Sequence, residues 1–235
     1  MEVILDHATH VYTNTATSEK YTSVTTFISQ YKKPFDKDFW SKRVAQREGV
    51  DQQSVLDSWN SITKTAQNRG TQVHLVMEQF IKDRRIEPGF EELVESFVTK
   101  TTGIIKPKST ILSETLLHSH EHKLAGMSDL IIENDDIFHV LDFKTNKKFN
   151  FCSKYNEYFF EPVEYLQQCE FTSYTLQLSI YAYMYELMTG KRCGSLKIFY
   201  LREGNSRYWQ EINCTYMKSA VKDMLADRLK KLENA

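Results

Sequence analysis

The sequence lacks the usual marks of metal–thiolate, membrane and secreted proteins. Its four cysteines lie far apart, and none belongs to a Cys-x-x-Cys pair. Zinc and iron–sulfur sites usually take their ligands from such close pairs. We therefore expect free thiols in a reducing compartment and no iron–sulfur cluster.

Long apolar runs and a strong net charge are also missing. No window approaches the roughly 18 consecutive apolar residues of a membrane helix, so we expect no membrane partner. Residues 1–7 contain no basic stretch followed by an apolar run, which predicts no secretion signal and a cytoplasmic location, in the host cytoplasm if the chain is phage-encoded. The formal charge of −1 leaves DNA contact to local patches. No Gly-x-x-x-x-Gly-Lys-Ser/Thr loop occurs, so ATP is not expected as a cofactor.

The sequence does contain helical and strand patterns in alternation. With 235 residues, 41% of them apolar, it can bury one sizeable core. Strand patterns dominate residues 109–144, and helical spacing dominates the stretches on both sides. We predict an α/β (α+β) fold with a central mixed β-sheet flanked by helices. Residues 1–105 would form amino-terminal strands and a helical region packed on a core of residues 106–235, in one compact domain.

Periodicity and turn signals place the individual elements. Residues 1–22 are expected to hold two short strands, Ser23 to cap a short helix, and a further helix to follow Pro34. A long helix from Asp51 is expected to break or kink at Gly70 and to resume over 71–82. Further helices are predicted over 91–100, 163–189 and 216–232, and strands over 110–118, 123–133, 137–144, 195–202 and 207–212, the last two turning at Glu203–Asn205.

Residues that can carry chemistry are concentrated between Gly126 and Lys144. Asp142 and Lys144 are two positions apart on a predicted strand and must project to the same face. The preceding hairpin turn would bring Asp129 towards Asp142. Burying two carboxylates and an ammonium here is costly without a purpose. Because hard cations bind oxygen, we predict one or two Mg²⁺ or Mn²⁺ ions on Asp129 and Asp142, with the Phe143 carbonyl as a further candidate ligand.

Such a site would hydrolyse phosphodiesters, with Asp129, Asp142 and Lys144 as the catalytic residues. A divalent cation lowers the pKa of a bound water, and Lys144 would hold that water or neutralise charge on the phosphate. The alternative is that Asp129 is a surface residue near a turn. Asp142 and Lys144 would then be an exposed pair with little energetic weight.

Three more residues are candidate metal ligands. His74 and Glu78 lie one turn apart on a predicted helix, and imidazole can bind Mn²⁺ or Mg²⁺ beside carboxylates. A single helical histidine is otherwise a packed or hydrogen-bonded residue. Glu114 lies on the first core strand, either as an extra carboxylate for the metal or as a charge on an edge strand.

Alternating histidines follow Glu114 along the sequence. Three such residues on one strand face could bind zinc. They lie at the polar end of the strand, so a solvated hairpin tip is the preferred interpretation. The residues are His118, His120 and His122.

Candidate nucleic-acid contacts lie further along the chain. Gln177 and Tyr181 share a helix face, and amide and phenol groups suit contacts with phosphates or bases. An aromatic-rich core helix is the alternative for this segment. Lys147 and Lys148 follow the Asp142 strand, with aromatic residues close behind. This pattern fits single-strand binding, with a solvated loop as the alternative.

Four of these motifs together resemble the RecB-like exonuclease branch of the PD-(D/E)XK nuclease superfamily. They are Gly70-Thr71-Gln72-Val73-His74, Gly126-Met127-Ser128-Asp129, Asp142-Phe143-Lys144 and Gln177-Leu178-Ser179-Ile180-Tyr181. Their order and approximate separations match that branch over about half of the chain. The compact size is similar to that of phage-type recombination exonucleases and the mitochondrial genome maintenance exonuclease.

The resemblance implies a restriction-endonuclease-like core with a helical amino-terminal elaboration. The implied roles are metal binding by His74, Asp129 and Asp142, assistance to the attacking water by Lys144, and nucleic-acid contact by Gln177 and Tyr181. We expect a DNA exonuclease of recombination or repair that acts on single-stranded or duplex ends, as a homo-oligomer or with a recombination partner protein. Two alternatives stay open: a structure-specific or restriction-like endonuclease on the same core, and a non-catalytic DNA-binding protein on a nuclease fold.

Overall fold

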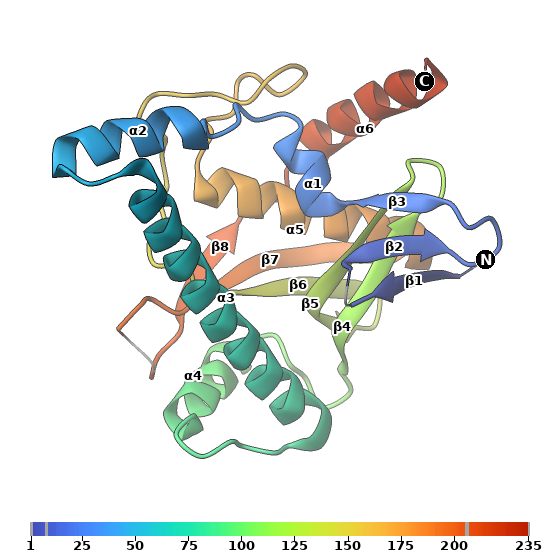
Figure 1. Ribbon diagram of the computed structural model, residues 1–235. Helices are drawn as coiled ribbons and strands as arrows, with labels where there is room; N and C mark the ends of the chain where they lie inside the picture. The colour runs from blue at the N-terminus through green and yellow to red at the C-terminus, as the bar shows by residue number, and fades with distance from the viewer. Residues whose placement is uncertain (1, 8, 205–206, 235) are drawn as a thin grey trace.

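The structure, a computed structural model, describes residues 2–7, 9–204 and 207–234. At its centre is a mixed sheet of eight strands with helices on both faces (Figure 1). The strands are β1 (Val3–Asp6), β2 (Val11–Asn14), β3 (Lys20–Ser23), β4 (Thr110–Ser119), β5 (Leu124–Asn134), β6 (Ile137–Lys144), β7 (Arg192–Tyr200) and β8 (Gln210–Cys214). The helices are α1 (Val24–Ser29), α2 (Lys37–Glu48), α3 (Gln52–Asp83), α4 (Glu91–Thr101), α5 (Glu170–Thr189) and α6 (Lys218–Glu233). The predicted fold class is confirmed.

The sheet is organised around β5. One edge of β5 pairs with antiparallel β4 over nearly its whole length. Two strands share the other edge of β5. The first residues of β5 pair parallel with β3, and its last residues pair antiparallel with β6. β6 then pairs parallel with β7, and β7 pairs antiparallel with β8. Parallel pairing brings the carboxyl ends of β6 and β7 side by side, where Lys144 lies opposite Tyr200.

Two apolar layers hold the helices to the sheet. On one face, α1, α5 and α6 pack against side chains such as Ile131 and Val140. On the other face, α4 and the second half of α3 pack against side chains such as Leu141 and Phe143. β5 and β6 are therefore fixed between α3 and α5. None of the described helices is both long enough and apolar enough to cross a bilayer.

Helix α3 is continuous over 32 residues, so of the break or kink predicted at Gly70 the break is wrong. Asp51 caps its start by accepting a hydrogen bond from the Ser54 amide. Glycine inside a helix costs about 1 kcal/mol relative to alanine. Here the absent side chain permits a close approach, since a Cβ on Gly70 would lie 3.2 Å from Thr145 Oγ1. The half before Gly70 exposes apolar side chains such as Ile62, and with α2 it projects from the sheet (Figure 1).

Three other local predictions need correction. The first 22 residues contribute three strands rather than two, and β3 extends the central sheet. Helix α5 begins at Glu170 rather than at residue 163, because residues before it form a loop in which the Phe159 amide donates to the Leu166 carbonyl oxygen. The histidine-bearing hairpin tip is solvated at His120 and Glu121 but not at His122, which is buried and whose carbonyl oxygen accepts a hydrogen bond from Arg228 of α6. Asn205 of the turn expected after β7 lies outside the described residues.

Candidate metal centre

Carboxylates from three neighbouring strands lie in a row across the sheet. The register of β4 against β5 places Glu114 opposite Asp129. The register of β5 against β6 continues to place Asp129 beside Asp142. The Phe143 amide donates a hydrogen bond to Asp129 Oδ2 at 2.7 Å, which fixes that carboxylate. Glu114 has a φ of 46°, a left-handed conformation that costs a residue with a side chain about 1–3 kcal/mol.

His74 reaches this row from α3. Its Nε2 lies 3.0 Å from the Phe143 carbonyl oxygen, and its Nδ1 lies 3.6 Å from Asp129 Oδ1. A carbonyl oxygen can only accept, so Nε2 carries the hydrogen in this contact. In the neutral imidazole Nδ1 then has the free lone pair, and this atom faces Asp129. One ligand atom from each of His74, Glu114 and Asp129 lies within 4.8 Å of the others. These three residues could therefore hold a metal ion, with the imidazole oriented by the hydrogen bond from its Nε2 to the Phe143 carbonyl oxygen.

The electrostatics of this group favour a bound cation. Burial raises the pKa of Asp129 to about 6, and the neighbouring charge of Asp142 adds to the rise. Burial also raises the pKa of Glu114 to about 7, with the charge of Asp129 as the second cause. Buried carboxylates that repel one another ionise at a cost, which a nearby positive charge reduces. Such clustered perturbation is typical of functional sites.

Asp142 and Lys144 form a buried ion pair next to this group. Lys144 Nζ lies 2.5 Å from Asp142 Oδ2, and their side chains are 17% and 3% exposed. Burial opposes the charged ammonium, but the charges of Asp142 and Asp129 outweigh it and raise the pKa of Lys144. Asp142 is thus the partner of Lys144 and is not one of the three residues grouped around His74. Metal binding by Asp142 stays a prediction.

Two other candidate ligands have partners within the chain. Glu78 forms an ion pair with Lys82, one turn further along α3. The Phe143 carbonyl oxygen is hydrogen-bonded to His74, so in this structure it orients the imidazole. Of the additional candidates, Glu114 is the one that joins His74 and Asp129 in the group. Direct ligation by Glu78 or by the carbonyl stays a prediction.

Gln177 and Tyr181 lie on α5, and both are buried. The Gln177 amide donates to the Tyr181 hydroxyl at 3.2 Å. A Cβ on Gly126 would lie 2.6 Å from Tyr181 Cε1, so this glycine makes room for the ring three residues before Asp129. Burial raises the pKa of Tyr181 above its ordinary value. The pair therefore packs against β5 close to Asp129, and its contact with a nucleic acid stays a prediction.

Lys147 and Lys148 are exposed just beyond β6. Lys147 Nζ lies 3.3 Å from Glu203 Oε2 in a solvent-exposed pair, which contributes little energy. The Lys148 ammonium has no hydrogen bond or salt bridge to any residue that the structure describes. Both side chains are therefore available to an anion, and DNA as that anion stays a prediction.

Sequence reasoning missed two residues that shape the site. Tyr174 presents its ring to Lys144 Nζ, 4.7 Å from the ring centre. Its position three residues before Gln177 places it on the same helix face, which is a signal in the sequence. No pattern indicated Arg69, which anchors α3 at the ends of β6 and β7. Arg69 donates hydrogen bonds to the carbonyl oxygens of Thr145 at 3.2 Å, Leu201 at 3.4 Å and Arg202 at 2.9 Å.

Comparison with known proteins leaves the family open. No protein-family model and no curated protein matches the sequence. The fold is similar to that of SSO0001, with 14% sequence identity and a TM-score of 0.35, over 91% of this chain and 77% of that chain. It is also similar to that of a candidate exonuclease from Eubacterium rectale, with 10% identity and a TM-score of 0.41, over 91% and 81% of the two chains. Both scores are low, so function has to be argued from the residues of the site.

Proposed function

We propose that this chain is a divalent-metal-dependent deoxyribonuclease of the RecB-like branch of the PD-(D/E)XK superfamily, and that it degrades DNA from ends. The observation that carries this proposal is the grouping of His74, Glu114 and Asp129 beside the buried Asp142–Lys144 pair. These donors suit Mg²⁺ or Mn²⁺. When bound, such a cation polarises a phosphate and lowers the pKa of a bound water.

The protein side chains have separate tasks in this proposal. Asp129 and Glu114 provide the negative charge that holds the cation, and His74 presents Nδ1 to it. Lys144 acts as a fixed positive charge, because its raised pKa keeps it protonated at neutral pH. A protonated lysine cannot accept a proton, so it donates hydrogen bonds to the attacking water or to a phosphate oxygen. Charge that develops on the phosphate in the transition state is thereby stabilised.

Cleavage of end-labelled DNA tests this function. Linear single-stranded DNA, linear duplex DNA and covalently closed circles are incubated with the wild type in Mg²⁺, Mn²⁺ or EDTA. The matched pair of variants is Lys144→Ala and Lys230→Ala, since Lys230 is an exposed lysine on α6. We expect metal-dependent loss of linear DNA only, retained in Lys230→Ala and lost in Lys144→Ala.

Other outcomes would change the assignment. Nicked or linearised circles would indicate an endonuclease on the same core. DNA binding without cleavage in either metal would refute the catalytic proposal and favour a binding protein. Equal activity of the two lysine variants would remove Lys144 from the mechanism.

A further inference from the structure

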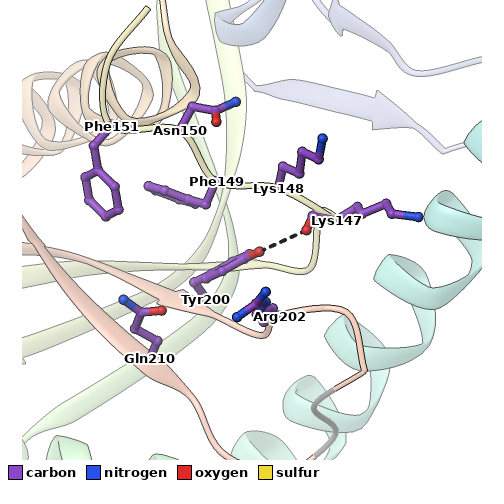
Figure 2. Close-up of a pocket in the computed structure, with 8 residues that line it drawn as sticks. All are labelled: Lys147, Lys148, Phe149, Asn150, Phe151, Tyr200, Arg202 and Gln210. Atoms are coloured by element: carbon purple, nitrogen blue, oxygen red, sulfur yellow. Dashed lines mark hydrogen bonds between the residues drawn. The ribbon is translucent and has the colours of Figure 1, made fainter. Parts of the chain in front are cut away.

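A second feature of the molecule is a pocket of about 300 Å³ between the segment that follows β6 and the ends of β7 and β8. Lys148, Phe149 and Phe151 line it from the first segment. Tyr200, at the end of β7, and Arg202, which follows it, line the opposite side of the pocket. Figure 2 shows the aromatic rings gathered towards one end and the basic side chains towards the other. The pocket therefore combines apolar ring surfaces with positive charge.

The aromatic side of the pocket is preformed. The Phe149 ring centre lies 5.1 Å from that of Phe151 and 5.1 Å from that of Tyr200. The Tyr200 hydroxyl donates to the Asn146 carbonyl oxygen at 3.0 Å. It also lies 3.4 Å from the Lys147 carbonyl oxygen, the contact dashed in Figure 2, so this ring is held in place. Phe151 is 55% exposed, which leaves much of its surface in water. A ring already fixed beside others loses little conformational entropy when a ligand stacks on it.

The basic side of the pocket lacks internal partners. The Lys148 ammonium and the Arg202 guanidinium form no hydrogen bond or salt bridge with any residue in the described parts of the chain. Lys147 contacts Glu203 through the exposed pair described above. One carboxylate therefore faces three cations, and an anionic ligand would find uncompensated positive charge.

Classes of ligand can be distinguished by which side chains of the pocket each would leave without a partner. A bare phosphate would leave the rings without a partner, and a neutral apolar ligand would leave Lys148 and Arg202 unpaired. A nucleotide satisfies both, because its base stacks on aromatic rings and its phosphate pairs with cations. A base inside a duplex has its faces covered by neighbouring bases, so the nucleotide has to be unpaired.

Side-chain contacts link the pocket to the candidate metal centre. Lys144 Nζ lies 4.7 Å from the Tyr174 ring centre, and the Tyr174 ring lies 5.7 Å from the Phe149 ring. Lys144 also lies opposite Tyr200 in the β6–β7 pairing. A strand whose phosphate reaches Lys144 therefore has the pocket beside it. We propose that this pocket binds an unpaired nucleotide of the DNA strand that is cut, with its base on Phe149 and Phe151 and its phosphate on Lys148 and Arg202.

This inference rests on the proposed nuclease function for its substrate, and it adds a preference for single-stranded ends. It is tested by binding in EDTA, where no hydrolysis occurs. Fluorescence anisotropy with labelled single-stranded and blunt duplex oligonucleotides compares the wild type with Phe151→Ala, Phe151→Trp and Arg202→Ala. Two controls change exposed residues elsewhere: Tyr165→Ala, near Glu164 and Asp223, and Lys230→Ala on α6.

We expect Phe151→Ala to weaken single-strand binding about tenfold, because stacking on one base contributes about 1–3 kcal/mol. Phe151→Trp should bind like the wild type, and duplex binding should change less than about twofold in every variant. Arg202→Ala should reduce the slope of log affinity against log salt by about 0.7, the value for one phosphate of a single strand.

Unchanged single-strand binding in Phe151→Ala and Arg202→Ala would overturn the inference, as would an equal loss for duplex DNA. Cleavage by the wild type, measured separately in Mg²⁺, distinguishes this failure from failure of the proposed function. Active cleavage with unaffected variants would refute the pocket alone. Selective loss of single-strand binding in a protein without nuclease activity would support the pocket and refute the enzyme.

Discussion

Replacing Asp129 by asparagine should stabilise the metal-free protein. The asparagine carbonyl oxygen can still accept the hydrogen bond that Phe143 donates to Oδ2 at 2.7 Å. What the substitution removes is a buried negative charge next to Asp142. The Asp129 side chain is 11% exposed, so solvent screens this charge only slightly. The substitution should also remove a metal ligand, which separates stability from metal binding.

The size of the effect follows from the pKa of Asp129. The pKa of this carboxyl rises from 3.8 to about 6 in the folded protein, mainly through burial. One pKa unit corresponds to about 1.4 kcal/mol, so ionising Asp129 in the folded state costs about 3 kcal/mol. Part of this is offset because the new amide hydrogens need partners. We expect a gain of about 1–3 kcal/mol in the free energy of unfolding.

The gain must depend on pH with a defined sign. The folded protein keeps the Asp129 proton up to about pH 6, whereas the unfolded chain releases it near pH 3.8. Between these values the folded state binds more protons, so wild-type stability falls as pH rises and the loss is complete above pH 6. The advantage of Asp129→Asn should therefore be absent below pH 3.8, about half developed at pH 5 and full at pH 8.

Urea denaturation in EDTA at pH 5 and pH 8 measures this prediction. Asp223→Asn, an exposed aspartate on α6, is the control and should change stability by less than about 0.5 kcal/mol at either pH. The reasoning is refuted if Asp129→Asn is less stable than the wild type at pH 8, or if its gain is the same at both values.

Three further predictions concern the site and its supports. At pH values below about 7 and limiting Mg²⁺, the cleavage rate should fall, and added metal should restore it. Protons compete with the metal at Glu114 and Asp129, whose pKa values are raised to about 7 and about 6. A metal requirement that does not change with pH would contradict this. Gly126→Ala should cost about 1–3 kcal/mol in urea denaturation, since its Cβ would lie 2.6 Å from Tyr181 Cε1, and the double variant with Tyr181→Ala should lose less than the sum of the single losses. Arg69→Ala should lower the free energy of unfolding by about 1–3 kcal/mol, because it removes hydrogen bonds to three carbonyl oxygens. An unchanged denaturation midpoint would show that these hydrogen bonds do not anchor α3.

Local sequence signals predicted much of this molecule. The approach of Asp129 to Asp142 followed from strand alternation and one short turn, both of which are encoded within about twenty residues. The cap at Ser23 and the start of a long helix at Asp51 were likewise local signals, and both side chains accept hydrogen bonds from the first turns of their helices. Short-range patterns are thus sufficient for elements whose partners lie nearby in the sequence.

The errors came from contacts between distant segments. Gly70 was expected to break a helix because the nearness of Thr145 is a tertiary feature. His122 was expected in solvent with the rest of its hairpin tip, because Arg228, which covers it, lies 106 residues away in the sequence. The closeness of Glu114 to His74 depends on the β4 register and on a left-handed residue that no local pattern indicates. These three features depend on contacts between segments that are far apart in the sequence, so local patterns could not predict them.

The most direct test of the central claim is anomalous scattering from a crystal grown with Mn²⁺. One strong anomalous peak is expected within about 2.5 Å of His74 Nδ1 and of carboxylate oxygens of Glu114 and Asp129. A further contact from Asp142 or the Phe143 carbonyl would extend the ligand set. Full Mn²⁺ occupancy elsewhere, with no peak between these three side chains, would contradict the account.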